Sequence, residues 1–181
     1  MKHYYPLLGC VLLIILMVLP AYSEEPLFET TTKGIIEALT DPEAKYPQLE
    51  SGLLNAKKEV FQKALGVRAV NLKIEFDINS YTVRKESFQL LNNLGRALTS
   101  KKLWAKKIMV KGHTDSDGHQ DHNERLSMAR AQAVTNYSMV NFPIPPHRMK
   151  AKGYGETEPL VPNSGNYNKQ INRRVEIQID E

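Results

Sequence analysis

Residues 106–140, KKIMVKGHTDSDGHQDHNERLSMARAQAVTNYSMV, contain a strand, a polar loop and a long helix in immediate succession. Apolar side chains two positions apart within 106–111 predict a strand with one buried face. Residues 121–140 repeat apolar side chains at helical spacing, and the Asp121-x-x-Glu124 pattern predicts a capping box at the helix start. The predicted buried stripe of this helix comprises Leu126, Ala129, Ala133, Tyr137 and Val140.

Further strands and one more helix surround this unit. Strict alternation over 70–78 predicts a half-buried strand, and apolar spacing over 84–100 predicts a helix with one apolar face. The remaining predicted elements are a short strand at 148–152, loops at 153–155 and 163–166, and a last strand at 173–179. This order predicts an α/β protein of the α+β two-layer sandwich kind, with a sheet that carries its helices on one face.

The N-terminus has the layout of a secretory signal peptide over residues 1–23. Lys2 supplies a positive start, and residues 7–19 form an apolar run. Small residues at Ala21 and Ser23 fit the −3 and −1 positions of a cleavage site, which predicts cleavage after Ser23. The layout predicts that the rest of the chain is exported.

Two alternatives to cleavage remain open. Residues 4–22 carry no charge, so they could serve as an uncleaved membrane anchor at the short end of the spanning range. Cys10 lies in a sequence that resembles a lipoprotein cleavage box, although the apolar run follows it rather than precedes it. All three interpretations place most of the chain in the periplasm or cell envelope, with outer-membrane or inner-membrane association as an option. Cys10 is the only cysteine, so a cleaved chain has no disulfide.

Residues 24–68 are predicted to form a helical extension or linker ahead of a main domain at 69–181. A short helix is expected at 32–39 and a longer one, with an apolar face, at 47–65. The region holds no chemical motif, so it is either a spacer or a docking helix. An exposed apolar face would need a partner, which is either the main domain or another protein.

The composition restricts the partners. The net charge is +4 and the calculated pI is about 9.1, a mild basic excess that fits an acidic polymer or a membrane surface. The sequence shows no Lys/Arg cluster interleaved with aromatic residues, which argues against nucleic acid as a partner.

Asp115 is the first candidate binding residue. It follows the strand at 106–111 within a loop, and ligand sites in α/β proteins favour the region just past the carboxyl ends of strands. A carboxylate at that place can accept hydrogen bonds from an ammonium group. The alternative is that Asp115 only caps its loop by accepting from neighbouring backbone N–H groups.

Arg130 is the second candidate, fifteen positions after Asp115. Its guanidinium could capture a ligand carboxylate with two parallel hydrogen bonds. The alternatives are a solvated side chain or a structural ion pair, including one with Asp115 itself. A carboxylate and a guanidinium together could hold a small zwitterion at both ends.

These motifs, in this order, resemble the OmpA-like C-terminal peptidoglycan-binding domain. The resemblance covers about residues 70–180, and agreement of many weak motifs makes it specific. The matching pieces are Phe76-Asp77-Ile78-Asn79-Ser80, His113-Thr114-Asp115-x-x-Gly118, Asn123-x-x-Leu126-Ser127-x-x-Arg130-Ala131-x-x-Val134, Gly153-Tyr154-Gly155-Glu156 and Asn172-Arg173-Arg174-Val175-Glu176.

The resemblance implies a mixed sheet, in the order βαβαβ-β, that binds the diaminopimelate of the peptidoglycan stem peptide without catalysis. Asp115 matches the aspartate that meets the ligand ammonium, and Arg130 matches the arginine that meets its carboxylate. It does not say which of Arg173 and Arg174 approaches the peptide. The other implied positions are Thr114, Asn123, Leu126, Phe76, Asp77 and Asn79.

Two other functions remain as alternatives. The chain could be a structural subunit of a secretion or motor complex in a Gram-negative envelope, docked through its N-terminal helical region. It could also be a metal-dependent hydrolase that uses His113, Asp115, His119 and His122, whose spacing on paper resembles a metal cluster. We expect no metal and no cofactor, because loop histidines are commonly just solvated.

Overall fold

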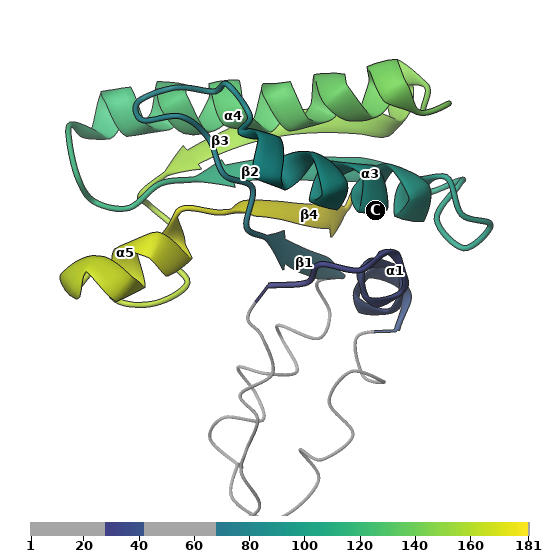
Figure 1. The fold of residues 1–181 in the computed structure, drawn as a ribbon, viewed down its shortest axis with the longest axis horizontal. Helices are drawn as coiled ribbons and strands as arrows, with labels where there is room; N and C mark the ends of the chain where they lie inside the picture. The colour runs from purple at the N-terminus through teal and green to yellow at the C-terminus, as the bar shows by residue number, and fades with distance from the viewer. Residues whose placement is uncertain (1–27, 42–67, 181) are drawn as a thin grey trace, which may run out of the picture.

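A four-stranded mixed sheet forms the centre of the computed structural model (Figure 1). Its order is β1-β4-β2-β3. Strands β2 and β3 are parallel, and β4 is antiparallel to both β1 and β2. The strand bounds are β1 Ala69–Leu72, β2 Ile108–His113, β3 Met149–Gly155 and β4 Val175–Ile179.

The structure describes residues 28–41 and 68–180. The predicted signal peptide, anchor or lipidation site and the predicted helix at 47–65 lie outside these residues. Within the described part of the chain, no helix combines the length and the apolar character needed to cross a membrane.

Helices α1, α3 and α4 share a hydrophobic core with the sheet, whereas α5 lies beyond its end (Figure 1). This arrangement confirms the α+β architecture. Helix α4 covers β2 and β3, whereas α1 packs against α3 and β1 (Figure 1). The helix bounds are α1 Thr32–Thr40, η1 Lys85–Ser87, α3 Phe88–Leu98, α4 Gln120–Asn141, η2 Pro146–Arg148 and α5 Gly165–Asn172, where η marks a 3-10 turn.

Helix α1 belongs to the same hydrophobic core as the sheet. Ile35 and Leu39 are 0% exposed and lie in one cluster with Leu91 of α3 and Ile177 of β4. The short helix predicted at 32–39 therefore forms, and it packs on the main domain.

Two glycines let α4 lie directly on the sheet. A Cβ atom at Gly112 would sit 2.0 Å from the Ser127 carbonyl oxygen, and one at Gly153 would sit 2.5 Å from the Met128 backbone nitrogen. Such a close approach leaves room only for small or short side chains between helix and strands. The buried residues of α4 are accordingly Asn123, Ser127, Ala131, Val134, Thr135 and Ser138.

The predicted apolar stripe of this helix is therefore wrong in part, because Tyr137 alone of its five residues packs against the core cluster. Leu126, Ala129, Ala133 and Tyr137 are only half-buried, and Val140 is 82% exposed. The capping box is also wrong, because the N-cap lies two residues before Asp121. His119 is the N-cap and makes no side-chain cap bond.

Three other element predictions need correction. The strand predicted at 70–78 ends at Leu72, since the chain leaves the sheet and makes an isolated bridge between Phe76 and Val83. The loop predicted at 153–155 continues strand β3. The loop predicted at 163–166 leads into α5, a short polar helix whose apolar periodicity is too brief to detect.

Candidate functional site

A cleft of about 520 Å³ opens where β2 and β3 end. Its walls come from the segment after β1, the loop between β2 and α4, the first turns of α4, and the junction of α5 with β4. All ten predicted binding residues line it: Phe76, Asp77, Asn79, Thr114, Asp115, Asn123, Leu126, Arg130, Arg173 and Arg174. The sequence thus selected residues that the fold brings to one place from four separate segments.

Asp115 is buried and already has partners on both carboxylate oxygens. Its Oδ1 accepts from the Asp117 backbone N–H at 3.0 Å, and its Oδ2 accepts from Nη1 of Arg173. The side chain therefore caps its own loop and also forms an ion pair across the cleft. The loop-capping alternative and the charged-site interpretation both describe this residue.

Arg130 does not pair with Asp115, contrary to one of the alternatives. Its Nε donates to the Ser80 carbonyl oxygen at 3.0 Å, and its guanidinium lies 5.0 Å from the centroid of the Phe76 ring. Within the described residues, Nη1 and Nη2 have no hydrogen-bond partner. Burial lowers the pKa of Arg130, the nearby Arg173 adds to this, and Asp115 opposes it. Two charge-bearing nitrogens thus stay available in the cleft.

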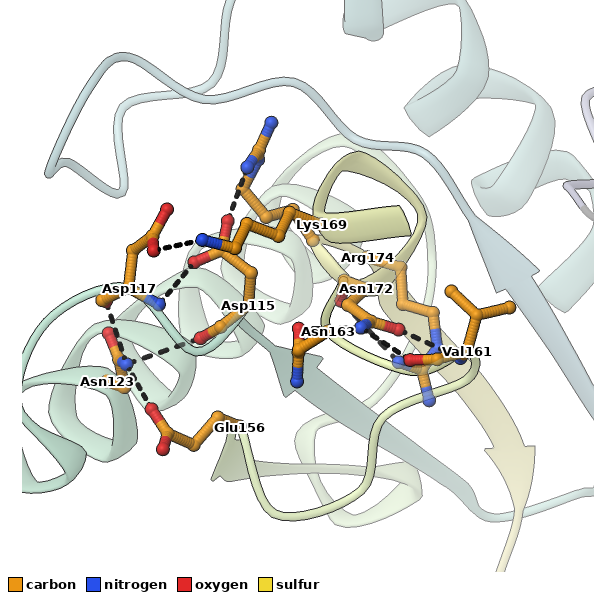
Figure 2. A network of polar contacts seen from close by, with 10 residues as sticks. Asp115, Asp117, Asn123, Glu156, Val161, Asn163, Lys169, Asn172 and Arg174 are labelled. Carbon is orange, nitrogen blue, oxygen red and sulfur yellow. Dashed lines mark hydrogen bonds and ion pairs between the residues drawn. The ribbon is translucent and has the colours of Figure 1, made fainter. Parts of the chain in front are cut away.

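Asn123 ties the Asp115 loop to its surroundings. Its Nδ2 lies 3.3 Å from the Asp115 carbonyl oxygen, 3.0 Å from the Asp117 carbonyl oxygen and 2.6 Å from Oε2 of Glu156 (Figure 2). The two amide hydrogens are therefore shared among three acceptors. Asn123 is 2% exposed, so it positions the loop rather than presenting a surface.

Sequence reasoning missed two residues that support this loop. Glu156 accepts a hydrogen bond from Asn123. It is the last residue of the motif at 153–156, so the sequence contained a pattern that could have pointed to it. Lys169 of α5 forms an ion pair with Asp117 (Figure 2). Nothing in the sequence pattern pointed to Lys169, because the helix that carries it was not predicted.

Asn172 fixes the other side of the site. Its Oδ1 accepts from the backbone N–H groups of Leu160 and Val161. Its Nδ2 donates to the Val161 carbonyl and to Oδ1 of Asn163 (Figure 2). The side chain is 0% exposed. It locks the segment before α5 to the end of that helix, directly before Arg173.

The neighbours Arg173 and Arg174 have different roles. Arg173 is exposed and pairs with Asp115. Arg174 is 5% exposed; its Nε donates to Oδ1 of Asn71 at 3.0 Å and its Nη2 to the Glu158 carbonyl at 3.2 Å. We call Asp115, Arg130 and Arg173 the rim of the cleft.

A buried polar cluster, which we call the floor, consists of His113, Arg174 and Glu176. His113 lies 3.6 Å from Glu176 and stacks on Tyr154, and burial lowers the pKa of this histidine. Burial alone would raise the pKa of Glu176. Contact with His113 and an ion pair with Lys111 at 3.0 Å outweigh that effect and lower this pKa to about 2.

The remaining predicted positions vary in exposure. The Thr114 hydroxyl is buried and has no hydrogen-bond partner among the described residues, and its backbone N–H donates to the Gly155 carbonyl at 2.8 Å. Asp77 and Asn79 are exposed, and Asn79 adopts a φ of 51°, which asparagine tolerates better than most residues. Leu126 is half-buried.

The histidines of the hydrolase alternative do not converge. His119 and His122 are exposed and do not line the cleft. Among residues 28–41 and 68–180, no group of three or more His, Cys, Asp or Glu side chains is placed to hold a metal ion.

Comparison with known proteins gives the family. Residues 75–173 match the OmpA family. The chain belongs to this family. It is 33% identical to outer membrane porin F of Pseudomonas aeruginosa over 111 residues, which are 61% of this chain and 31% of that protein. It is also 33% identical to the probable lipoprotein YiaD of Escherichia coli over 106 residues, 59% of this chain and 47% of that protein.

Solved structures share the fold of this OmpA-family chain. The cell wall anchor of the T6SS from Pseudomonas aeruginosa aligns with a TM-score of 0.53 and 29% identity, over 61% of this chain and 79% of that one. The peptidoglycan-associated lipoprotein from Burkholderia pseudomallei aligns with a TM-score of 0.53 and 25% identity, over 59% of this chain and 88% of that one. The chain spans about a third of the length of the porin F relatives.

Proposed function

We propose that the cleft binds peptidoglycan without catalysis, through the zwitterionic end of diaminopimelate in the stem peptide. Asp115 accepts from the ligand ammonium, and Nη1 and Nη2 of Arg130 donate to the ligand carboxylate. The observation that carries the proposal is that a buried carboxylate and a guanidinium with two unused nitrogens line one cleft. Charge-assisted hydrogen bonds of this kind are the strong ones in proteins.

Binding requires an exchange of partners at Asp115. Arg173 occupies the carboxylate that the ligand ammonium would take. The Arg173 side chain is 43% exposed, so water can solvate its guanidinium when it leaves. Asp115 is buried, and the arriving ammonium replaces the positive charge beside its carboxylate. Arg173 then faces the stem peptide and is available to another of its carboxylates. Arg174 stays committed to the floor.

The biological role that follows is attachment of the cell envelope to the wall. Two structural relatives support it by their names, one as a cell wall anchor and one as a peptidoglycan-associated lipoprotein. The wall repeats its stem peptide many times, so modest single-site affinity suffices when several copies are held at the same surface. We place the chain in the periplasm, on the basis of its predicted signal peptide.

Co-sedimentation with purified sacculi of the diaminopimelate type tests the proposal. The wild-type chain should sediment, and free diaminopimelate should compete. Asp115→Asn and Arg130→Gln should each lower binding at least tenfold, which corresponds to one lost charge-assisted bond of about 1.4 kcal/mol or more. Asp121→Asn and Arg125→Gln are matched controls, because both residues are exposed on α4 and neither lines the cleft. Equal binding by the rim variants and their controls would refute the two-ended grip.

A role as a subunit of an envelope complex is compatible with wall binding. The similarity to the T6SS anchor favours this second function. Deleting all of 24–68 would remove α1 and its core residues Ile35 and Leu39, so it is a poor test. Replacing 42–67 by a flexible linker keeps α1. We expect this variant to bind sacculi and to lose its complex if that region carries the docking surface.

A further inference from the structure

The turn between α3 and β2 is a basic surface with one exposed aromatic ring. Residues 101–107 read KKLWAKK, and they lie at the end of the sheet away from α5 and the cleft (Figure 1). The expectation that the chain holds no basic cluster interleaved with aromatic residues is therefore wrong, since the turn holds four lysines around the only tryptophan of the chain.

The turn is held rigidly, and it presents Trp104 outward. Leu103 is 0% exposed and anchors the turn in the core, whereas Trp104 is 63% exposed. The Trp104 backbone N–H donates to the Ser100 carbonyl at 2.8 Å. The buried Arg148 donates to the Leu103 carbonyl at 2.7 Å and to the Lys106 carbonyl at 3.0 Å. The backbone that carries Trp104 is thus held in place, while the indole ring lies in solvent.

The lysines around Trp104 are not paired with acidic side chains among residues 28–41 and 68–180, although Asp41 lines a shallow pocket with Lys102 and Lys106. Lys101, Lys102 and Lys107 are exposed and Lys106 is half-buried. None of these four lysines forms an ion pair within the described part of the chain, and residues 99–107 contain no acidic side chain. At the same end of the sheet, Asp180 pairs instead with Lys150, at 2.9 Å.

We propose that the Trp104 turn, residues 100–107, docks on the surface of an anionic phospholipid membrane. An indole ring on an apolar–polar boundary prefers the headgroup level of a bilayer. Clustered lysines are drawn to anionic headgroups at short range. A single-stranded nucleic acid would require several stacking rings along a groove, whereas this turn offers one ring at its apex. The charge and the lone fixed ring therefore favour a lipid surface.

The Trp104 turn and the cleft lie at opposite ends of strand β2. Strand β2 runs from the turn toward the cleft, from Ile108 to His113. Five residue steps of a strand cover about 17 Å, so the two surfaces lie at opposite ends of the domain. The protein could touch a membrane at one end while the cleft at the other end stays open. The membrane contact does not depend on what the cleft binds.

Trp104 is itself the probe for the test. The full-length chain is reconstituted with vesicles of phosphatidylcholine alone or of phosphatidylcholine with phosphatidylglycerol. The apolar run at 7–19 could associate with either kind of vesicle, so the readout is tryptophan emission rather than sedimentation. We expect a blue shift and protection from acrylamide quenching only with phosphatidylglycerol, and both should be reversed by high salt.

Charge variants complete the experiment. The triple variant Lys101→Gln, Lys102→Gln and Lys107→Gln should lose the shift. A control with the same charge change, Lys33→Gln, Lys85→Gln and Lys152→Gln, should keep it, because these exposed lysines lie outside the turn. Emission that is unchanged by either vesicle, or equally shifted by both, overturns the proposal. A shift that survives in the turn variant also overturns it. Sacculus binding by the same preparation reports on the cleft separately.

Discussion

The rim and the floor of the cleft use similar charged groups for different purposes. In the rim, Arg173 is exposed, and its guanidinium has one partner among the described residues, the Asp115 carboxylate. In the floor, Arg174 is buried, and Nε, Nη1 and Nη2 all donate to protein oxygens, with Glu176 at 3.7 Å as well. Two arginines that are adjacent in sequence thus differ in how many of their guanidinium nitrogens donate to protein oxygens.

The Arg174 guanidinium holds the fold, whereas the Arg130 and Arg173 guanidinium groups keep nitrogens that the proposed ligand can use. A guanidinium with all its nitrogens engaged cannot leave without stranding buried oxygens, which costs far more than an exposed ion pair. A guanidinium with one engaged nitrogen, such as that of Arg130, can accept a new partner. We therefore expect floor substitutions to lower stability and rim substitutions to lower binding.

The largest expected effect comes from the two neighbouring arginines. Arg174→Met should lower the free energy of unfolding by about 4 kcal/mol, since it removes one partner of a buried, hydrogen-bonded pair. Arg173→Gln should lower it by less, about 1–2 kcal/mol, because Arg173 is exposed and the buried Asp115 keeps its bond from the Asp117 N–H. Urea denaturation of both variants, followed by circular dichroism, measures the difference. Similar losses in the two variants would show that rim and floor are not distinct.

The next effect is the dependence of stability on pH. The folded pKa of Glu176, about 2, lies below its usual value of 4.5, so its contribution is complete above pH 4.5 and is lost as the pH falls toward 2. The contribution amounts to about 3 kcal/mol. His113 acts in the same direction at higher pH. Its folded pKa is lowered, so the unfolded chain binds the proton first and stability falls below pH 6.5.

Denaturation midpoints in urea between pH 7 and pH 2.5 test this account. Glu176→Gln should flatten the curve below pH 4.5, and His113→Phe should flatten it just below pH 6.5. Glu124→Gln serves as a control, because this carboxylate is exposed on α4. An unchanged acid limb in the Glu176 variant would mean that other carboxylates govern the loss of stability.

The sequence predicted the rim better than it predicted the floor. Asp115 and Arg130 stand in motifs whose spacing is local, within one loop and the following helix, so pattern reasoning reached them. The ion pair between Lys111 and Glu176 depends on the antiparallel pairing of β2 with β4, and no local pattern encodes that register. For the same reason the sequence left open which of Arg173 and Arg174 would meet the proposed ligand.

The errors in the elements have a common physical cause. The stripe predicted for α4 assumed that the largest apolar residues are buried, but Gly112 and Gly153 bring the helix so close that small residues face the sheet. The alternation that predicted a strand up to residue 78 continues past the point where pairing ends. Ile78 fits that alternation and is 93% exposed. Packing distance and strand pairing are tertiary properties that override local pattern.

Asn123 connects the two regions, and its substitution gives the smallest but most discriminating effect. Its amide contacts the Asp115 and Asp117 carbonyls and the Glu156 carboxylate, yet it does not need to touch the ligand. Asn123→Ala should lower the free energy of unfolding by about 1–2 kcal/mol, the cost of unpaired buried polar groups. It should also weaken sacculus binding about tenfold, because the Asp115 loop loses its fixed position.

The control for this variant is Asn136→Ala, an exposed position on the same helix. If the binding loss arises from a displaced loop, the Asn123→Ala protein that still binds sacculi should be released by free diaminopimelate at high concentration. Asp115→Asn, by contrast, should remain insensitive to the competitor, because the ammonium partner itself is gone. If Asn123→Ala is destabilised but binds sacculi normally, Asn123 contributes to stability and not to binding. The Asp115 loop would then be held in position by the contacts of Arg173 and Lys169.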